Sequence, residues 1–245
     1  MPGSAPISTV VLVHGLRTSS SMWRHQVLAL SALGYTVITP DLPGHGSRMH
    51  ERFTLAGGVE TIDRAVAAAP GPVFLCGFSL GGYLAAHWAA AEPRDVTGIL
   101  AASCGTQPSR VILDAWRVGA AAIHLLPDRG LGLNNAVVRA VIRDPEYADD
   151  VIAGGVALEV MQDVLRELRG IRMAHSLSRI EQPIWLVNGT LDHIRLQERS
   201  FLAATRHGTL VRIPGASHMV SVARPVEFTR VLVDAINSSR PADGL

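Results

Sequence analysis

Short apolar runs alternate with longer stretches of helical periodicity along most of this chain. Apolar runs bounded by glycine, proline and polar residues are typical of buried strands, and the stretches between them are typical of covering helices. We predict six strands, at Thr9 to Val13, Thr36 to Thr39, Val73 to Cys76, Gly98 to Ala102, Ile184 to Asn188 and Leu210 to Ile213. Helices are predicted near Ser21 to Leu33, Leu55 to Ala69, Leu80 to Ala91, Leu196 to Thr205 and Pro225 to Asn237. The alternation predicts an α/β fold, a doubly wound and mostly parallel sheet with helices on both faces.

The alternation of predicted strands and helices is interrupted between Cys104 and Arg179. Long amphipathic stretches replace it, at Asp114 to Leu126, Leu133 to Ile142 and Ala148 to Leu168, the last with a break expected at Gly154-Gly155. This segment is longer than one crossover connection needs. An ordinary crossover helix flanked by disordered residues is disfavoured, because so many of the residues are apolar. We therefore predict a core at 1–103 and 180–245, and a helical cap at 104–179 over the carboxyl edge of the sheet, where open α/β sheets bind ligands.

The charges of the chain are nearly balanced, with a formal net charge of +1. This balance favours a soluble globular protein and does not favour a nucleic acid or an anionic membrane as partner. All 22 basic residues are arginine. Chemistry that depends on a lysine amine is therefore excluded.

Cysteine use and the apolar segments bear on cellular location. Cys76 and Cys104 are too few for a disulfide framework and lack metal-ligand spacing, so we expect a reduced, cytoplasmic setting. The first residues lack a basic region followed by a long apolar one, and no later segment offers about 18 uninterrupted apolar residues. We expect neither export nor a membrane span, and the oligomeric state stays open.

The segment Gly77-Phe78-Ser79-Leu80-Gly81 follows the third predicted strand directly. A G-x-S-x-G pattern between a strand and a helix forms a sharp turn that lifts the serine hydroxyl clear of the sheet, and its glycines avoid clashes with neighbouring backbone. The pattern alone is weak, but here a strand precedes it and an alanine-rich helix follows. We predict that Ser79 is a nucleophile.

A serine nucleophile needs a histidine base and an acid that orients the histidine. His218 lies in the loop after the last predicted strand, and Asp192 lies in the turn after the fifth. This gives the chain order serine, acid, histidine that accompanies such a turn. His14 and His45 are assigned to structural hydrogen bonding in turns, and His193 is poorly placed to reach Ser79.

Backbone donors for the developing oxyanion are expected beside the nucleophile. We assign them to the N–H groups of Leu80, directly after Ser79, and of Leu16, in the loop after the first strand. Phe78 and Met219 are assigned to the substrate pocket. Arg17 is a further pocket candidate that could contact a substrate carboxylate, although a solvated surface arginine is the favoured interpretation. No metal or organic cofactor is expected, because the chain supplies the nucleophile, the base and the donors.

These ordered motifs resemble those of the α/β-hydrolase-fold serine hydrolases over nearly the whole chain outside the cap. The matching segments are Val10-Val11-Leu12-Val13-His14-Gly15, Pro40-Asp41-Leu42-Pro43-Gly44-His45-Gly46-Ser47 and Gly77-Phe78-Ser79-Leu80-Gly81-Gly82, with Asp192 and His218. The resemblance implies Ser79 as nucleophile, His218 as base and Asp192 as acid, with Asp41 in a structural role. The fold is shared by esterases, lipases, lactonases, thioesterases, carbon–carbon bond hydrolases and some cofactor-free haloperoxidases, so it names no substrate.

Two departures from the family pattern narrow the resemblance. His14 lies so near the start that one strand fits before it in place of the usual hairpin, and we predict a trimmed sheet. The same early start occurs in small methylesterase-like and hydroxynitrile-lyase-like relatives. The segment Ser217-His218-Met219 resembles the histidine loop of these relatives. A lyase of that group would need a lysine near the site, and this chain has none. Hydrolysis is therefore favoured over cyanohydrin cleavage.

The sequence predicts a serine hydrolase that cleaves a carboxylic ester of a small or medium, mainly apolar substrate through an acyl-serine intermediate. A thioesterase or a lactonase with the same residues is an open alternative, as is a small-molecule sensor that retains them. The cap should set substrate choice, although packing of its helices is favoured over substrate contact for most of its apolar side chains. These are Trp116, Ile123, Leu126, Val137, Ile142 and Met161.

Overall fold

Six parallel strands form one sheet in the computed structural model, which describes residues 9–91 and 96–239. The strand order is β2-β1-β3-β4-β5-β6. The predicted fold class is confirmed. The prediction that no strand precedes β1 concerns residues 1–8, which lie outside the described residues. The strands are β1 (Thr9–Val13), β2 (Thr36–Ile38), β3 (Val73–Phe78), β4 (Val96–Ala102), β5 (Ile184–Gly189) and β6 (Gly208–Ile213).

The chain reverses its direction of travel across the sheet at β1, because β2 lies on one side of β1 and β3 lies on the other. Crossover helices before and after such a reversal cover opposite faces, which leaves a crevice at the carboxyl ends of the two strands. Leu16 follows β1 and Ser79 follows β3. The topology therefore brings the predicted nucleophile and the predicted oxyanion loop to the same crevice.

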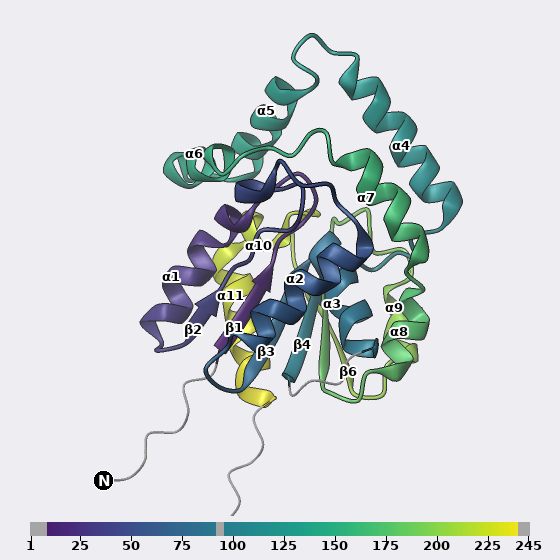
Figure 1. The fold of residues 1–245 in the computed structure, drawn as a ribbon. Coiled ribbons are helices and arrows are strands. Elements are labelled where there is room, and N and C mark those ends of the chain that lie inside the picture. Colours follow the sequence, from purple (N-terminus) through teal and green to yellow (C-terminus); the bar gives the residue numbers. More distant parts are fainter. Residues whose placement is uncertain (1–8, 92–95, 240–245) are drawn as a thin grey trace, which may run out of the picture.

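Helices cover both faces of the sheet (Figure 1). On one face lie α1 (Arg24–Ala32), which continues a 3-10 turn at Ser20–Trp23, and α11 (Pro225–Ser238), which follows the short α10 (Val220–Ala223). On the other face lie α2 (Leu55–Ala67), α3 (Leu80–Ala91), α8 (Met173–Arg179) and α9 (Glu198–Ala204). A further 3-10 turn spans Gly46–Arg48.

Alternate side chains of the central strands enter different cores. Val11 and Leu75 pack in the core under α2 and α3, whereas Val10 and Phe74 pack in the core under α1 and α11. All four are nearly inaccessible to solvent. Strands buried on both faces appear in the sequence as continuous apolar runs, which explains why their positions could be predicted closely.

The segment between β4 and β5 is helical, as predicted. It contains α4 (Arg110–His124), α5 (Leu131–Val141), α6 (Pro145–Ala153) and α7 (Met161–Glu167), then a 3-10 turn at Leu168–Gly170. In Figure 1, α4 to α7 lie beyond the carboxyl ends of the strands. The predicted third helix is two helices separated by residues 154–160. This segment begins with Gly154 and Gly155, and Gly155 has the left-handed φ of 92° that favours glycine. The domain boundary at 179 stays a prediction. The helix α8 falls inside the predicted cap range, yet it packs against α3 of the core.

The third helical stretch begins earlier than predicted, at Pro145 instead of Ala148. The Asp144 carboxylate accepts hydrogen bonds from the N–H groups of Glu146 and Tyr147. An aspartate N-cap followed by proline at the first helical position is a strong start signal, which the apolar pattern alone did not show. Tyr147, itself 1% exposed, donates its hydroxyl to the carbonyl of Met22 and so ties α6 to the core.

Candidate active site

Ser79 occupies a strained turn between β3 and α3. Its φ of 50° lies in the left-handed region, which costs a non-glycine residue about 1–2 kcal/mol. The surrounding backbone holds the turn, because the Ser79 N–H donates to the Ala102 carbonyl at 2.8 Å. A Cβ on Gly77 would lie 2.2 Å from the Gly81 oxygen, and one on Gly81 would lie 2.3 Å from the Val13 oxygen. Both glycines of the motif are therefore required by close backbone approach.

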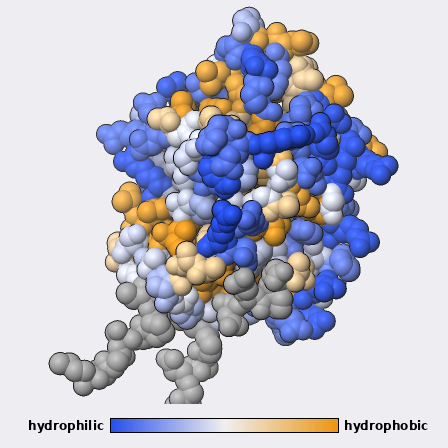
Figure 2. Space-filling model, viewed as in Figure 1, coloured by the Kyte–Doolittle hydropathy of each residue, from blue (hydrophilic) through white to orange (hydrophobic). Residues whose placement is uncertain are grey.

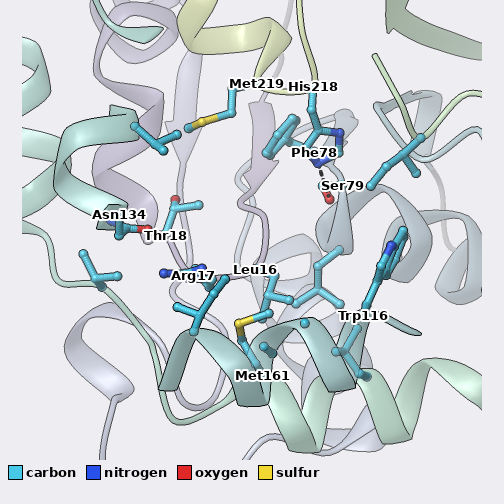
Figure 3. Close-up of a pocket in the computed structure, with 18 of the residues that line it drawn as sticks. Leu16, Arg17, Thr18, Phe78, Ser79, Trp116, Asn134, Met161, His218 and Met219 are labelled. Carbon is cyan, nitrogen blue, oxygen red and sulfur yellow. Dashed lines mark hydrogen bonds between the residues drawn. The ribbon is translucent and has the colours of Figure 1, made fainter. Parts of the chain in front are cut away.

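His218 forms hydrogen bonds with both Ser79 and Asp192, and Figure 3 shows the one with Ser79. Its Nε2 is 3.1 Å from the Ser79 Oγ, and its Nδ1 is 3.0 Å from the Asp192 Oδ1. A carboxylate can only accept, so Nδ1 carries the proton and the Nε2 lone pair faces the serine hydroxyl. The Ser103 hydroxyl donates to the His218 carbonyl at 2.8 Å and helps hold the loop. The structure thus brings together three residues that are distant in the sequence.

Asp192 is 4% exposed, at the end of the turn after β5. Burial on its own raises the pKa of this carboxyl, but the hydrogen bond and charge of His218 and the N–H of Ile194 outweigh burial, and the pKa lies below its usual value. The Ile194 N–H donates to Oδ1 at 2.8 Å. Asp192 is therefore ionised at neutral pH and can stabilise a positive charge on His218.

The loop after β1 approaches the nucleophile closely. A Cβ on Gly15 would lie 2.7 Å from the ring of Phe78, so only glycine fits there without displacement. Leu16 follows in this loop, and Leu80 is the first residue of α3, where helical N–H groups lack an intrahelical acceptor. Both residues line the pocket that contains Ser79. Both residues of the predicted oxyanion hole therefore lie in the same pocket as the serine.

A pocket of about 480 Å³ opens above Ser79, between the sheet loops and the inserted helices. The predicted pocket residues Arg17, Phe78 and Met219 all line it. Of the apolar side chains predicted for the cap, Trp116, Ile123, Val137 and Met161 also line it, whereas Leu126 is exposed and Ile142 is buried in the core. The pocket is mainly apolar with a few polar groups, which is usual for a site that binds a small molecule.

A model of the alpha/beta hydrolase family matches residues 10–231. The chain belongs to the alpha/beta hydrolase family. It is 26% identical over 242 residues to a pimeloyl-(acyl-carrier protein) methyl ester esterase from Yersinia pseudotuberculosis, with 92% of each chain covered. The resemblance seen in the sequence motifs is thereby confirmed.

Solved structures of low sequence identity share the fold of this hydrolase. A thermophilic esterase from Thermogutta terrifontis has a TM-score of 0.76 at 19% identity, covering 97% of this chain and 92% of that one. An enol-lactonase from Burkholderia xenovorans also has a TM-score of 0.76, at 20% identity, covering 96% of this chain and 93% of that one. At these identities the likeness concerns the fold.

Two buried histidines and an aspartate support the loops of the hydrolase site. His14 accepts from the Leu42 N–H through Nε2 at 3.0 Å, while its Nδ1 donates to the Gly15 carbonyl at 2.8 Å. Burial lowers the pKa of His14, and burial together with the charge of His14 lowers the pKa of His45 to about 3. Asp41 accepts from the N–H groups of Ser20 and Ser47. All three therefore have the structural hydrogen bonds expected of them.

Some pocket residues were not expected from the sequence. The ring of His193 lies 5.3 Å from that of His218 and lines the same pocket, and the prediction that it is poorly placed to reach Ser79 stays a prediction. Thr18 and Asn134 also line it. Asn134 comes from α5, far along the chain, and no local pattern marks it as a pocket residue. Within 9–91 and 96–239, no three metal-ligating side chains are grouped so as to hold an ion.

Proposed function

We propose that this hydrolase cleaves carboxylic esters through an acyl intermediate on Ser79. The observation that carries the proposal is the position of His218, which bridges the Ser79 hydroxyl and the Asp192 carboxylate. His218 takes the proton as the Ser79 oxygen attacks the ester carbonyl, and returns it to the alcohol when the carbon–oxygen bond breaks. Water then attacks the acyl-serine with His218 again as base, and the acid leaves.

The N–H groups of Leu16 and Leu80 stabilise the oxyanion in both steps. One such donor typically lowers the barrier by about 3 kcal/mol. Asp192 keeps the Nδ1 proton in place and stabilises the imidazolium that forms. These roles are supported by the positions of Leu16 and Leu80 in the lining of the pocket that contains Ser79, and by the burial of Asp192.

The substrate we propose is small or medium and mainly apolar. The size and lining of the pocket support this, and so does the relative that is named for hydrolysis of a methyl ester. Helices α4, α5 and α7 act as the cap that limits acyl chain length, because each contributes apolar side chains to the pocket.

We keep the expected cytoplasmic setting as part of the proposal, since Cys76 and Cys104 are buried free thiols. Among the described helices, none has both the length and the apolar character that a bilayer crossing requires.

The test compares purified wild type with Ser79→Ala on a panel of esters, lactones and acyl thioesters of graded chain length. We expect repeated turnover of esters by wild type, a loss of at least about a thousandfold in Ser79→Ala, and fluorophosphonate labelling of Ser79 alone. Ser178→Ala, at an exposed position in α8, is the matched control and should behave as wild type. Undiminished turnover by Ser79→Ala, or binding by wild type without repeated turnover, would contradict the proposal. A preference for thioesters or lactones would correct the substrate class.

A further inference from the structure

Arg17 brings an isolated positive charge to the pocket. No aspartate or glutamate lines this pocket in the part of the chain that the structure describes, and Arg17 is its one permanently charged side chain there. In Figure 3, Arg17, Thr18 and Asn134 lie on one side of the pocket, and Ser79 and His218 lie on the other. The guanidinium and the reacting atoms therefore lie on different sides of a mainly apolar pocket.

The guanidinium of Arg17 has no hydrogen-bond or ion-pair partner in the part of the chain that the structure describes. Its Nε is buried without a hydrogen-bond partner, and among residues 9–91 and 96–239 no side chain forms an ion pair with it. Burial lowers the pKa of Arg17, although an arginine remains charged at neutral pH. Arg48, by contrast, pairs with Glu51 and donates to Thr61. An unpaired charge is costly in an apolar pocket, and an anionic group on a ligand would remove that cost.

The backbone of Arg17 adds a second, independent observation. Its φ of 67° is left-handed, where glycine is favoured and a side chain is strained. The position thus combines a strained backbone with an unpaired guanidinium, and it does so inside the pocket. Active sites and ligand clamps are among the places where such strain occurs, and in this pocket Ser79 shows it too. The side chain of Arg17 thus lines the pocket with its Nε buried, whereas the sequence favoured a solvated surface arginine.

We propose that Arg17 binds a free carboxylate at the far end of the acyl group, so that the preferred substrate is a monoester of a dicarboxylic acid. The planar fork of a guanidinium matches both oxygens of a carboxylate. The acyl half is the one concerned because it stays in the pocket, bonded to Ser79, through both chemical steps. Thr18 and Asn134 are polar groups on the same side of the pocket. This inference rests on the proposed ester hydrolysis, but part of its test does not.

The kinetic test uses mono-4-nitrophenyl esters of straight-chain dicarboxylic acids of graded length, each beside the ester of the equally long fatty acid. For at least one length, we expect wild type to favour the acidic ester about tenfold or more in kcat/KM. In Arg17→Gln this ratio should fall to about one, and Arg17→Lys should keep part of it. Arg199→Gln removes the same charge from an exposed site outside the pocket and should keep the wild-type ratio. A ratio near one in wild type at every length, or an unchanged ratio in Arg17→Gln, overturns the proposal.

The binding test does not require turnover. Titration calorimetry with the free dicarboxylic acids should detect binding to Ser79→Ala, weakened about tenfold or more in Ser79→Ala with Arg17→Gln. Arg17→Gly relieves the left-handed strain, so it serves as a well-folded second variant if Arg17→Gln is unstable. Equal binding with and without Arg17, or no binding at all, overturns the inference even if Ser79 hydrolyses neutral esters. If binding depends on Arg17 but the wild type hydrolyses no ester, the carboxylate site is supported and the proposed hydrolysis is contradicted.

Discussion

The pocket wall formed by the sheet loops and the wall formed by α4, α5 and α7 hold their side chains by different means. On the sheet side, His14 and Asp192 are buried and fixed by hydrogen bonds to backbone N–H groups. On the helical side, several polar contacts are exposed ion pairs, such as Arg129 with Glu159 and Arg139 with Asp149. Figure 2 shows hydrophobic and hydrophilic side chains side by side at the surface. Leu125, in the turn after α4, is 87% exposed.

This difference indicates how the two walls divide their tasks. Exposed ion pairs contribute little to stability, whereas buried hydrogen-bonded groups are expensive to disturb. The sheet wall therefore fixes the geometry of the reacting groups, and the helical wall can change its side chains at small cost to folding. Substitutions on the sheet wall should therefore alter reaction rate or stability, and substitutions on the helical wall should alter substrate preference.

The largest effect is expected from Asp192→Asn on the sheet wall. An asparagine amide can donate to His218 Nδ1, which would leave the Nε2 proton facing Ser79 and remove the base. We expect kcat to fall about a thousandfold or more, with little change in KM for a short nitrophenyl ester. The matched control is Asp149→Asn on the helical side, whose partner Arg139 is also exposed. Equal activities for the two variants would contradict the division of tasks.

A smaller effect should appear in the pH dependence of stability. The pKa of His45 falls from 6.5 in the unfolded chain to about 3 in the folded one. Between these values the unfolded state binds the additional proton, so acidification favours unfolding. Lowering the pH from about 7 to about 4 should cost about 3 kcal/mol of unfolding free energy through this group.

Urea unfolding at several pH values tests this expectation. In His45→Asn the amide can replace the Nδ1 donor to the Pro43 carbonyl, and the loss of stability in acid should be smaller. The exposed His50→Asn is the control and should follow wild type. A His45→Asn variant with the full wild-type loss would show that the acid sensitivity comes from other groups.

The smallest effect is expected on the helical wall. Trp116→Ala in α4 enlarges the pocket, so esters with longer acyl chains should gain over short ones by about fivefold to tenfold in kcat/KM. Its kcat for short esters should remain close to wild type, because the reacting groups lie on the other wall. Val118→Ala, on the same helix but 71% exposed and outside the pocket, should show no such shift. An equal shift in both variants would mean that α4 acts through stability and not through contact.

The sequence predicted the sheet wall better than the helical wall, for physical reasons. Strands buried on both faces require continuous apolar residues, and the turn at Ser79 requires glycines, so both leave local signals. The pocket contacts of Asn134, by contrast, arise from the packing of α5 over a distant part of the chain. For Arg17 the sequence left a pocket role and a solvated surface role open and favoured the second, because its lack of a partner becomes visible only in the assembled pocket. The same holds for His193, whose ring approaches His218 only in the folded chain.

The buried thiols have a consequence for chemical labelling. Cys76 and Cys104 are both inaccessible, and burial raises the pKa of each, so neither presents a thiolate at the surface. The chain also lacks lysine, so no side-chain amine competes for an electrophile. A serine-directed reagent would therefore meet few rival nucleophiles on the folded protein. Its reaction with Ser79 could be followed by intact mass, without first blocking thiols or side-chain amines.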